Sequence, residues 1–183
     1  MNSLEKDQHI TKIMLIGLDN SGKSSILLSF KENTNLLSYF SLNPTKGLNI
    51  ESAVSPQSDM VLWELGGQTQ YRDDYLKNFD KYLKDLDKVI YVIDIQDIER
   101  HDLAIKYLKD IMDALKESGI HVDLSIYLHK YDPNLSKKEK FKDVDKTITP
   151  ELINKIEKLI PPDFSYNIYK TSIYTTFEKF LIK

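Results

Sequence analysis

Residues 17–24 read Gly17-Leu18-Asp19-Asn20-Ser21-Gly22-Lys23-Ser24, which matches the pattern G-x-x-x-x-G-K-[ST] in full. An apolar run, Lys12–Ile16, precedes this stretch and a helical pattern over Gly22–Lys31 follows it, as the motif requires. In such a loop, successive backbone N–H groups converge on phosphate oxygens at the N-terminus of the helix. We expect Lys23 to reach the β- and γ-phosphates and the Ser24 hydroxyl to ligate Mg²⁺. The alternative is a chance match in a glycine-containing turn, and the correct flanking pattern argues against it.

The rest of the chain alternates short apolar runs with helical patterns. Further strands are expected at Ile50–Val54, Met60–Trp63, Lys88–Asp94, Leu124–Leu128 and Tyr166–Tyr169, the first two joined as a hairpin through Ser55–Ser58. Helices are expected over Leu103–Leu115 (stopping at Gly119), Pro150–Ile160 and Phe177–Ile182. This alternation predicts an α/β fold with a mostly parallel six-stranded sheet, one antiparallel edge strand and helices on both faces. Ligands of such sheets bind at the carboxyl ends of the strands.

Length and composition exclude several classes of protein. The 183 residues are expected to form one domain, residues 1–183, with residues 1–10 as a short polar extension. The 25 basic and 28 acidic side chains lack the basic excess typical of nucleic-acid binders. The sequence has no cysteine, which excludes disulfides, zinc thiolate sites, prenylation and palmitoylation.

A membrane location is not supported by the sequence. The apolar runs are about five residues long, whereas a bilayer-spanning helix needs ~20. The polar N-terminus does not resemble a signal peptide, and Asn2 excludes N-myristoylation. We therefore expect a cytoplasmic protein without a transmembrane segment, in which the N-terminus does not support peripheral membrane association.

Several motifs resemble small GTPases of the Ras superfamily. Both Asn43–Glu51 and Trp63–Gln68 resemble the switch regions of the ADP-ribosylation-factor (Arf) family, as does the start of the phosphate loop. By contrast, Ile90–Asp97, Leu128–Asp132 and Lys170–Tyr174 resemble the Rag/Gtr GTPases, in which His replaces the usual Asn of the base-reading motif. The motifs stand in the proper order between Ile13 and Ile182. Their mixture favours an early-branching, archaeal member of the Arf/Rag group.

The base-reading motif also makes chemical sense by itself. Asp132 can accept hydrogen bonds from N1–H and the exocyclic amine of guanine, an arrangement that adenine does not offer. The alkyl stem of Lys130 would lie over the base, and a ring N–H of His129 would tie this loop to the phosphate loop. Ser172 and Ile173 would present backbone N–H groups to guanine O6. The alternative reading of His-Lys-x-Asp is a solvated surface loop.

The resemblance implies roles for the remaining site residues. Thr45 would close on Mg²⁺ and the γ-phosphate, Gly67 would donate its N–H to the γ-phosphate, and Gln68 would orient the attacking water as the catalytic residue. The alternative is that Thr45 and Gln68 are ordinary loop residues. Together with these, the nucleotide would be held by residues of the phosphate loop, namely Asp19, Asn20, Ser21, Gly22, Lys23, Ser24 and Ser25.

One position departs from the family pattern. Glu64 stands where the family has an Asp that holds a water on Mg²⁺, and the extra methylene extends the carboxylate by ~1.5 Å. Because Mg²⁺ demands near-ideal octahedral geometry, the metal shell formed by Ser24, Thr45 and Glu64 is expected to differ from that of the family.

The resulting hypothesis is a Mg²⁺-dependent switch that binds GTP and GDP and hydrolyses GTP at ~10⁻⁴–10⁻³ s⁻¹ without an activating protein. No arginine is placed as a finger in cis, and Arg72 is expected to be a surface residue. A non-hydrolysing GTP-bound interaction module is the alternative, and an ATPase or small-molecule kinase would require Asp132 to be coincidental. The expected partners are effectors, an exchange factor and an activating protein. We expect no additional C-terminal domain of the kind found in Rag relatives, and dimerisation would then use the GTPase domain itself.

Overall fold

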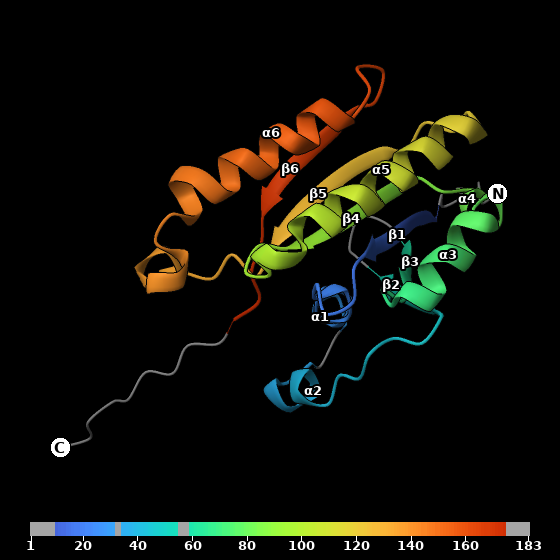
Figure 1. Ribbon diagram of the computed structural model, residues 1–183. Helices are drawn as coiled ribbons and strands as arrows, with labels where there is room; N and C mark the ends of the chain where they lie inside the picture. The colour runs from blue at the N-terminus through green and yellow to red at the C-terminus, as the bar shows by residue number, and fades with distance from the viewer. Residues whose placement is uncertain (1–9, 32–33, 55–58, 175–183) are drawn as a thin grey trace, which may run out of the picture.

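The computed structural model describes residues 10–31, 34–54 and 59–174. Six strands form one sheet in the order β2-β3-β1-β4-β5-β6 (Figure 1). Their bounds are β1 (Thr11–Gly17), β2 (Leu48–Val54), β3 (Asp59–Leu65), β4 (Lys88–Asp94), β5 (Asp123–His129) and β6 (Tyr166–Lys170). Only the pairing of β2 with β3 is antiparallel; the other four pairings in the described sheet are parallel. The predicted mostly parallel sheet with one antiparallel edge strand is therefore confirmed.

Helices connect the strands as the pattern predicted, with three additions. The helices are α1 (Lys23–Ser29), α2 (Leu36–Phe40), α3 (Thr69–Lys77), α4 (Asp80–Leu83), α5 (His101–Ser118) and α6 (Thr149–Leu159). Short 3₁₀ turns form η1 (Ile98–Arg100), η2 (Leu135–Lys137) and η3 (Glu139–Phe141), and a π-helical turn forms η4 (Val144–Ile148). Helix α5 ends at Gly119, whose φ of 66° provides the left-handed cap that the sequence indicated. Helices α2, α3 and α4 were not predicted, and the expected turn Ser55–Ser58 and helix Phe177–Ile182 lie outside the described residues.

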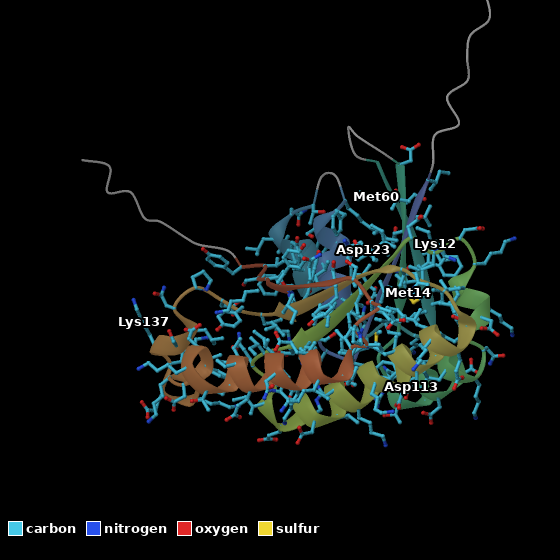
Figure 2. All side chains as sticks on the ribbon, turned by 90° about the horizontal axis from the view of Figure 1, so that it is seen from above. Lys12, Met14, Met60, Asp113, Asp123 and Lys137 are labelled. Atoms are coloured by element: carbon cyan, nitrogen blue, oxygen red, sulfur yellow. The ribbon has the colours of Figure 1, made fainter. Side chains whose placement is uncertain are left out.

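Alternation along the strands directs side chains to two apolar clusters, one on each face of the sheet. Met14 and Ile16 of β1 belong to the larger cluster, which contains residues of α3, α5 and α6. Ile13 and Leu15 belong to the smaller cluster, which α1 covers with Ile26 and Leu27. Figure 2 shows Met14 inside the molecule, whereas Asp113 lies on the outer side of α5. Helices thus cover both faces, and no described helix is both long and apolar enough to cross a membrane.

The parallel arrangement brings the ends of β1, β3, β4, β5 and β6 to one edge of the sheet. Backbone hydrogen bonds join the loops that follow these strands: Asp19 N–H donates to Gly67 O at 3.1 Å, and Tyr131 N–H donates to Thr171 O at 3.0 Å. Every segment that the sequence singled out for chemistry lies at this edge or in a loop beside it. This is the edge at which open α/β sheets bind their ligands.

Candidate functional site

The phosphate loop follows β1 and curls tightly. Glycine stands at the two positions where the loop backbone comes close to a neighbouring strand or side chain. A Cβ at Gly22 would lie 2.4 Å from Cδ2 of His129, and Gly22 has φ 97°. A Cβ at Gly17 would lie 2.3 Å from the carbonyl oxygen of Val92. Both glycines are therefore required by packing as well as by conformation. Gly22 also precedes α1 directly, so the loop meets the N-terminus of that helix.

Lys23 is a buried cation to which no carboxylate of the described residues is directly bonded. Its Nζ donates to the carbonyl oxygens of Gly17 at 3.0 Å and Leu18 at 2.7 Å. Burial lowers the pKa of Lys23 to about 8, against the opposing attraction of Glu64 and Asp19. An anion bound at the loop would stabilise the charged form further and raise this pKa. The loop is thus suited to a phosphate.

Three side-chain oxygens that could ligate a metal ion lie close together beside Lys23. The Ser24 hydroxyl donates to Oε1 of Glu64 at 2.5 Å, and the Thr45 hydroxyl donates to the same oxygen at 3.0 Å. The two hydroxyl oxygens are 3.1 Å apart. Neighbouring ligands of octahedral Mg²⁺, each ~2.1 Å from the metal, are ~3.0 Å apart. The two distances to the Thr45 hydroxyl, 3.0 and 3.1 Å, agree with this spacing, whereas the 2.5 Å distance between Ser24 and Glu64 is shorter.

The carboxylate of Glu64 also fits a metal electrostatically. Glu64 is 1% exposed, and its second oxygen, Oε2, has no hydrogen-bond partner among the described residues. An unpaired buried carboxylate oxygen is costly unless a cation compensates it. No three His, Cys, Asp or Glu side chains in the described ranges gather into a metal site of their own. A hard cation held by Ser24, Thr45, Glu64 and a phosphate is consistent with both observations.

A cleft of about 250 Å³ runs along the phosphate loop. Residues of the phosphate loop, the segment before β2 and the end of β3 line it: Asp19, Asn20, Gly22, Lys23, Ser24, Ser25, Leu42, Asn43, Pro44, Thr45, Glu64, Gly67 and Gln68. Of the loop residues predicted to hold phosphate, Ser21 is the exception. It is 2% exposed and lies beneath the loop, where it lines a small cavity beside β4.

The loop after β3 lies directly on the phosphate loop. The carbonyl of Gly67 accepts the hydrogen bond from Asp19 N–H, and a Cβ at Gly67 would lie 2.2 Å from that nitrogen. Gly66 N–H donates to Gly47 O at 2.9 Å, which joins this loop to the segment that carries Thr45. Gln68 precedes α3 and is half-buried at the cleft. Thr45, Gly67 and Gln68 therefore face one space together.

The base-reading residues form a bonded cluster beyond β5. Oδ1 of Asp132 accepts from the Ser172 hydroxyl at 2.5 Å, and Oδ2 accepts from Nε2 of Gln96 at 2.9 Å. Nζ of Lys130 donates to Asn20 O at 2.7 Å and pairs with Asp94 at 2.7 Å. The carboxylate is thereby held in one orientation, and Lys130 ties its loop to the phosphate loop.

His129 has a different partner from the one expected. Its Nδ1 lies 2.9 Å from the Thr171 hydroxyl, and the ring reaches the phosphate loop by packing against Gly22. The predicted hydrogen bond from a ring N–H of His129 to the phosphate loop was therefore wrong. The edge of the ring packs against Gly22, which has no side chain, instead of donating to the loop. Burial, together with the nearby charge of Lys130, lowers the pKa of His129.

Two residues of this edge were missed by the sequence reasoning. Gln96 bonds to Asp132 and also to the carbonyl of Lys130 at 2.7 Å. Arg100 pairs with Asp19 at 2.9 Å, and its Nε donates to Asp97 at 2.6 Å. Both residues follow the end of β4, so their position after a parallel strand was the signal that could have identified them.

Arg72 corrects a further expectation. It is 8% exposed, so it is not a surface residue. Its Nη2 donates to the Thr69 hydroxyl at 2.9 Å, and its guanidinium lies 5.1 Å from the ring centroid of Tyr107 on α5. Helix α3 is thus anchored against α5 through a cation–π contact that depends on long-range packing.

Comparison with known proteins finds relatives in the ADP-ribosylation factor family. The model of the ADP-ribosylation factor family matches residues 1–174. ADP-ribosylation factor-like protein 3 of Chlamydomonas reinhardtii is 30% identical over 132 residues, which are 72% of this chain and 69% of that protein. ADP-ribosylation factor-like protein 2 of Arabidopsis thaliana is 28% identical over 178 residues, which are 96% of this chain and 84% of that protein.

The fold is also similar to that of a solved small GTPase. It is the Arl6 small GTPase of Trypanosoma brucei with the bound nucleotide analogue GppNp. The two structures superpose with a TM-score of 0.61 over 88% of this chain and 86% of that chain, at 19% sequence identity. The likeness establishes the small-GTPase fold.

Proposed function

The chain belongs to the ADP-ribosylation factor family of small GTPases, and on that premise we propose that it is a GTP-binding switch that slowly hydrolyses GTP to GDP and phosphate. One observation carries the proposal: a buried lysine in a complete phosphate loop and an oriented aspartate at the base-reading position open on adjoining clefts. The first suits a nucleotide's phosphates and the second suits guanine. The phosphates would lie along residues 19–25, as in nucleotide sites at helix N-termini generally.

Guanine selectivity is assigned to Asp132. Its carboxylate oxygens keep lone pairs free beside the bonds from Ser172 and Gln96, because each carboxylate oxygen accepts more than one hydrogen bond. They would accept from N1–H and the amine of guanine, with Lys130 against the base face. Ile173 lines the same cleft, and the backbone near Ser172 would meet guanine O6. A base without those donors would leave the remaining lone pairs of the Asp132 carboxylate without a hydrogen bond.

Magnesium would be held by Ser24, Thr45 and Glu64. The close approach of their three oxygens and the unpaired Oε2 of the buried Glu64 carboxylate support this assignment. Bound Mg²⁺ supplies charge neutralisation between the β- and γ-phosphates. Since Oε1 of Glu64 already contacts both hydroxyls, we propose that Glu64 ligates the metal directly, where the shorter aspartate of the family pattern acts through water.

Hydrolysis would rely on Gln68 to orient the attacking water. Gln68 lines the phosphate cleft together with Gly67 and Thr45, which would sense the γ-phosphate. The arginine nearest to the phosphate loop in the described structure, Arg100, is held by Asp19 and Asp97. With that guanidinium engaged, intrinsic turnover would stay near ~10⁻⁴–10⁻³ s⁻¹ until an activating protein supplies an arginine.

The second candidate is a GTP-bound module that does not hydrolyse. Glu64 favours it, because a direct carboxylate ligand would alter the metal shell on which hydrolysis depends. In that case the loops at Thr45 and Gly67 would hold one conformation whichever nucleotide is bound. Several expectations from the sequence stay predictions. They concern the protein partners (effectors, an exchange factor and an activating protein), dimerisation through the GTPase domain, and the extent of that domain over residues 1–183. They also include the cytoplasmic location, the Rag-like ancestry and the archaeal source.

The proposal is tested by the nucleotide content of the purified chain and by single-turnover hydrolysis with Mg²⁺. We expect bound guanine nucleotide, lost in Lys23→Ala because the phosphate charge is no longer compensated. Asp132→Asn should weaken GTP binding and shift the preference toward xanthosine triphosphate, whose carbonyl an amide can serve. Asp102→Asn, at an exposed ion pair with Lys155, is the matched control. Unchanged GTP affinity by calorimetry in Asp132→Asn would refute the base-reading assignment.

A further inference from the structure

Arg72 carries a buried positive charge to which the proposed mechanism gives no role. It lies on α3, which packs against α5 (Figure 1), and it is 8% exposed. Among the described residues, no carboxylate lies within ion-pair distance of Arg72, and its Nε has no hydrogen-bond partner. A cation removed from water without an anion is costly, so other contacts must hold this guanidinium in place.

Two contacts hold the guanidinium of Arg72. Its Nη2 donates to the Thr69 hydroxyl at 2.9 Å, and its Cζ lies 5.1 Å from the ring centroid of Tyr107 on α5. Tyr107 is 2% exposed and packs on Tyr91 of β4, with the two ring centroids 6.1 Å apart. Because the ring is fixed by the core and water is excluded from it, this cation–π contact is of the strong kind.

Both contacts act on the turn of chain that directly follows Gln68. Helix α3 begins at Thr69, and the carbonyl of Gln68 accepts from the N–H groups of Tyr71 at 3.0 Å and Arg72 at 3.2 Å. Gln68 itself has an extended backbone, with φ −68° and ψ 144°. The place of the Gln68 side chain in the phosphate cleft therefore depends on where the first turn of α3 is held.

The charge of Arg72 is also felt at the phosphate loop. Burial is the main cause of the lowered pKa of Lys23, and repulsion from Arg72 adds to that lowering. Yet Arg72 is not among the residues that line the phosphate cleft, and its guanidinium contacts Thr69 and Tyr107 instead. This arrangement favours an action through the helix over a direct contact with the nucleotide.

We propose that Arg72 is a positioning residue for Gln68, because it joins Thr69 to the buried ring of Tyr107 and so fixes the first turn of α3 relative to the phosphate loop. This inference rests on the proposed GTPase function. On the other side of Gln68, Gly67 is held by its hydrogen bond from Asp19 N–H. Displacement of a catalytic group by about 1 Å can slow a reaction about a hundredfold, so the anchor matters for hydrolysis more than for binding.

The test measures single-turnover hydrolysis of GTP with Mg²⁺ alongside the affinity for GTP. Arg72→Met and Tyr107→Leu should each hydrolyse GTP at least about tenfold more slowly than the parent, with unchanged GTP affinity. The variant with both changes should be no slower than the slower single variant, since each change removes the same contact. Tyr107→Phe keeps the ring and should keep the parent rate. Lys109→Met, at an exposed ion pair with Asp113 on α5, is the matched control.

Thr69 provides a second test at an exposed position, where a substitution opens no cavity in the core. Thr69→Val removes the hydroxyl that accepts from Arg72, and it should slow hydrolysis in the same direction as Arg72→Met. Thr69→Ser keeps the hydroxyl and should hydrolyse GTP at close to the parent rate. These two variants decide the inference if Tyr107→Leu does not fold.

The outcomes separate the inference from the proposed function. Parent-like hydrolysis by Arg72→Met or by Thr69→Val would overturn the positioning role and leave the GTPase assignment standing. Weakened GTP binding in Arg72→Met but not in Tyr107→Leu would also overturn it, because the arginine would then act on the phosphates as a charge. So would an equal loss of affinity and hydrolysis in both variants, which would indicate a general structural role. A parent chain that binds GTP without hydrolysing it would overturn the proposed hydrolysis itself.

Discussion

Glu64 accepts a hydrogen bond from the Ser24 hydroxyl at 2.5 Å, so the carboxylate of β3 directly contacts the phosphate-loop residue that would ligate Mg²⁺. The contact joins residues 40 positions apart. An aspartate at this position would end about one C–C bond short of the same hydroxyl, ~1.5 Å, and would leave space for a water. The proposed metal site therefore differs from the family pattern at Glu64.

Glu64→Gln should weaken the Mg²⁺ dependence of nucleotide retention. Loss of the charge removes an anionic metal ligand, so we expect the Mg²⁺ concentration needed for half-maximal GDP retention to rise about tenfold or more. The Mg²⁺ concentration needed by Glu64→Asp should lie between those of Glu64→Gln and the parent, because aspartate keeps the negative charge. The measurement is the rate of GDP release across a Mg²⁺ titration, with Glu51→Gln at the exposed Lys31 pair as control. Identical titrations for parent and Glu64→Gln would exclude Glu64 from the metal shell.

Gln68→Leu should retain GTP affinity and lose hydrolysis. The change removes only the amide that would orient the water, and we expect the single-turnover rate to fall by at least about tenfold. Asp73→Asn, at an exposed position on the same helix, should hydrolyse at close to the parent rate. If Gln68→Leu hydrolyses GTP as fast as the parent, Gln68 is not catalytic, and the proposed switch loses the residue on which its hydrolysis step depends.

Trp63 should report the nucleotide state. It is the only tryptophan in the sequence and precedes Glu64 on β3. Nζ of Lys12 lies 3.8 Å from the centroid of its ring, and Tyr82 meets it edge-on at 6.4 Å. Engagement of Gly67 by a γ-phosphate should shift the loop after β3, so the emission spectra of the GDP and GppNp complexes should differ.

Thr45→Ala should reduce that spectral difference, because it removes one of the two contacts that sense the γ-phosphate. Nucleotide loading is checked by chromatography in each sample. Superimposable spectra for the two complexes of the parent chain would favour the module that holds one conformation.

His129 should make stability depend on pH below neutrality. Its folded-state pKa is lowered by burial and by Lys130, so the unfolded chain binds more protons as the pH falls through about 6.5. The free energy of unfolding is expected to decrease from pH 7 toward pH 5.5. His129→Asn should flatten part of this slope, while His101, whose pKa burial also lowers, keeps the remainder. Denaturant titrations at several pH values measure the free energy of unfolding. An equal dependence of this free energy on pH in the parent and in His129→Asn would contradict the prediction.

Local sequence was sufficient to predict the elements whose structure follows from a pattern of residues close together along the chain. The buried strands have runs of apolar residues, as in Lys88–Asp94, and α5 has an apolar stripe that ends at a glycine cap. Helix α3 was missed because Thr69–Lys77 is largely polar. It is fixed instead by tertiary contacts, among them buried Tyr75 and the packing of Arg72 on Tyr107. Helix α2 buries none of its residues and shows no stripe to read.

The sequence by itself determined the phosphate loop and the order of the strands along the chain, because both depend on contiguous residues at fixed spacing. Its motifs pointed to a small GTPase but mixed Arf-like and Rag-like features, and the match to the ADP-ribosylation factor family model decided between them. Only the tertiary structure decided how the site residues meet. Arg100 reaches Asp19 across 81 positions, and Gln96 reaches Asp132 across 36. Such pairings depend on which strands are neighbours in the sheet and where each strand ends, and side-chain hydrogen bonds form only when that packing brings donor and acceptor within about 3 Å. No local pattern encodes that distance.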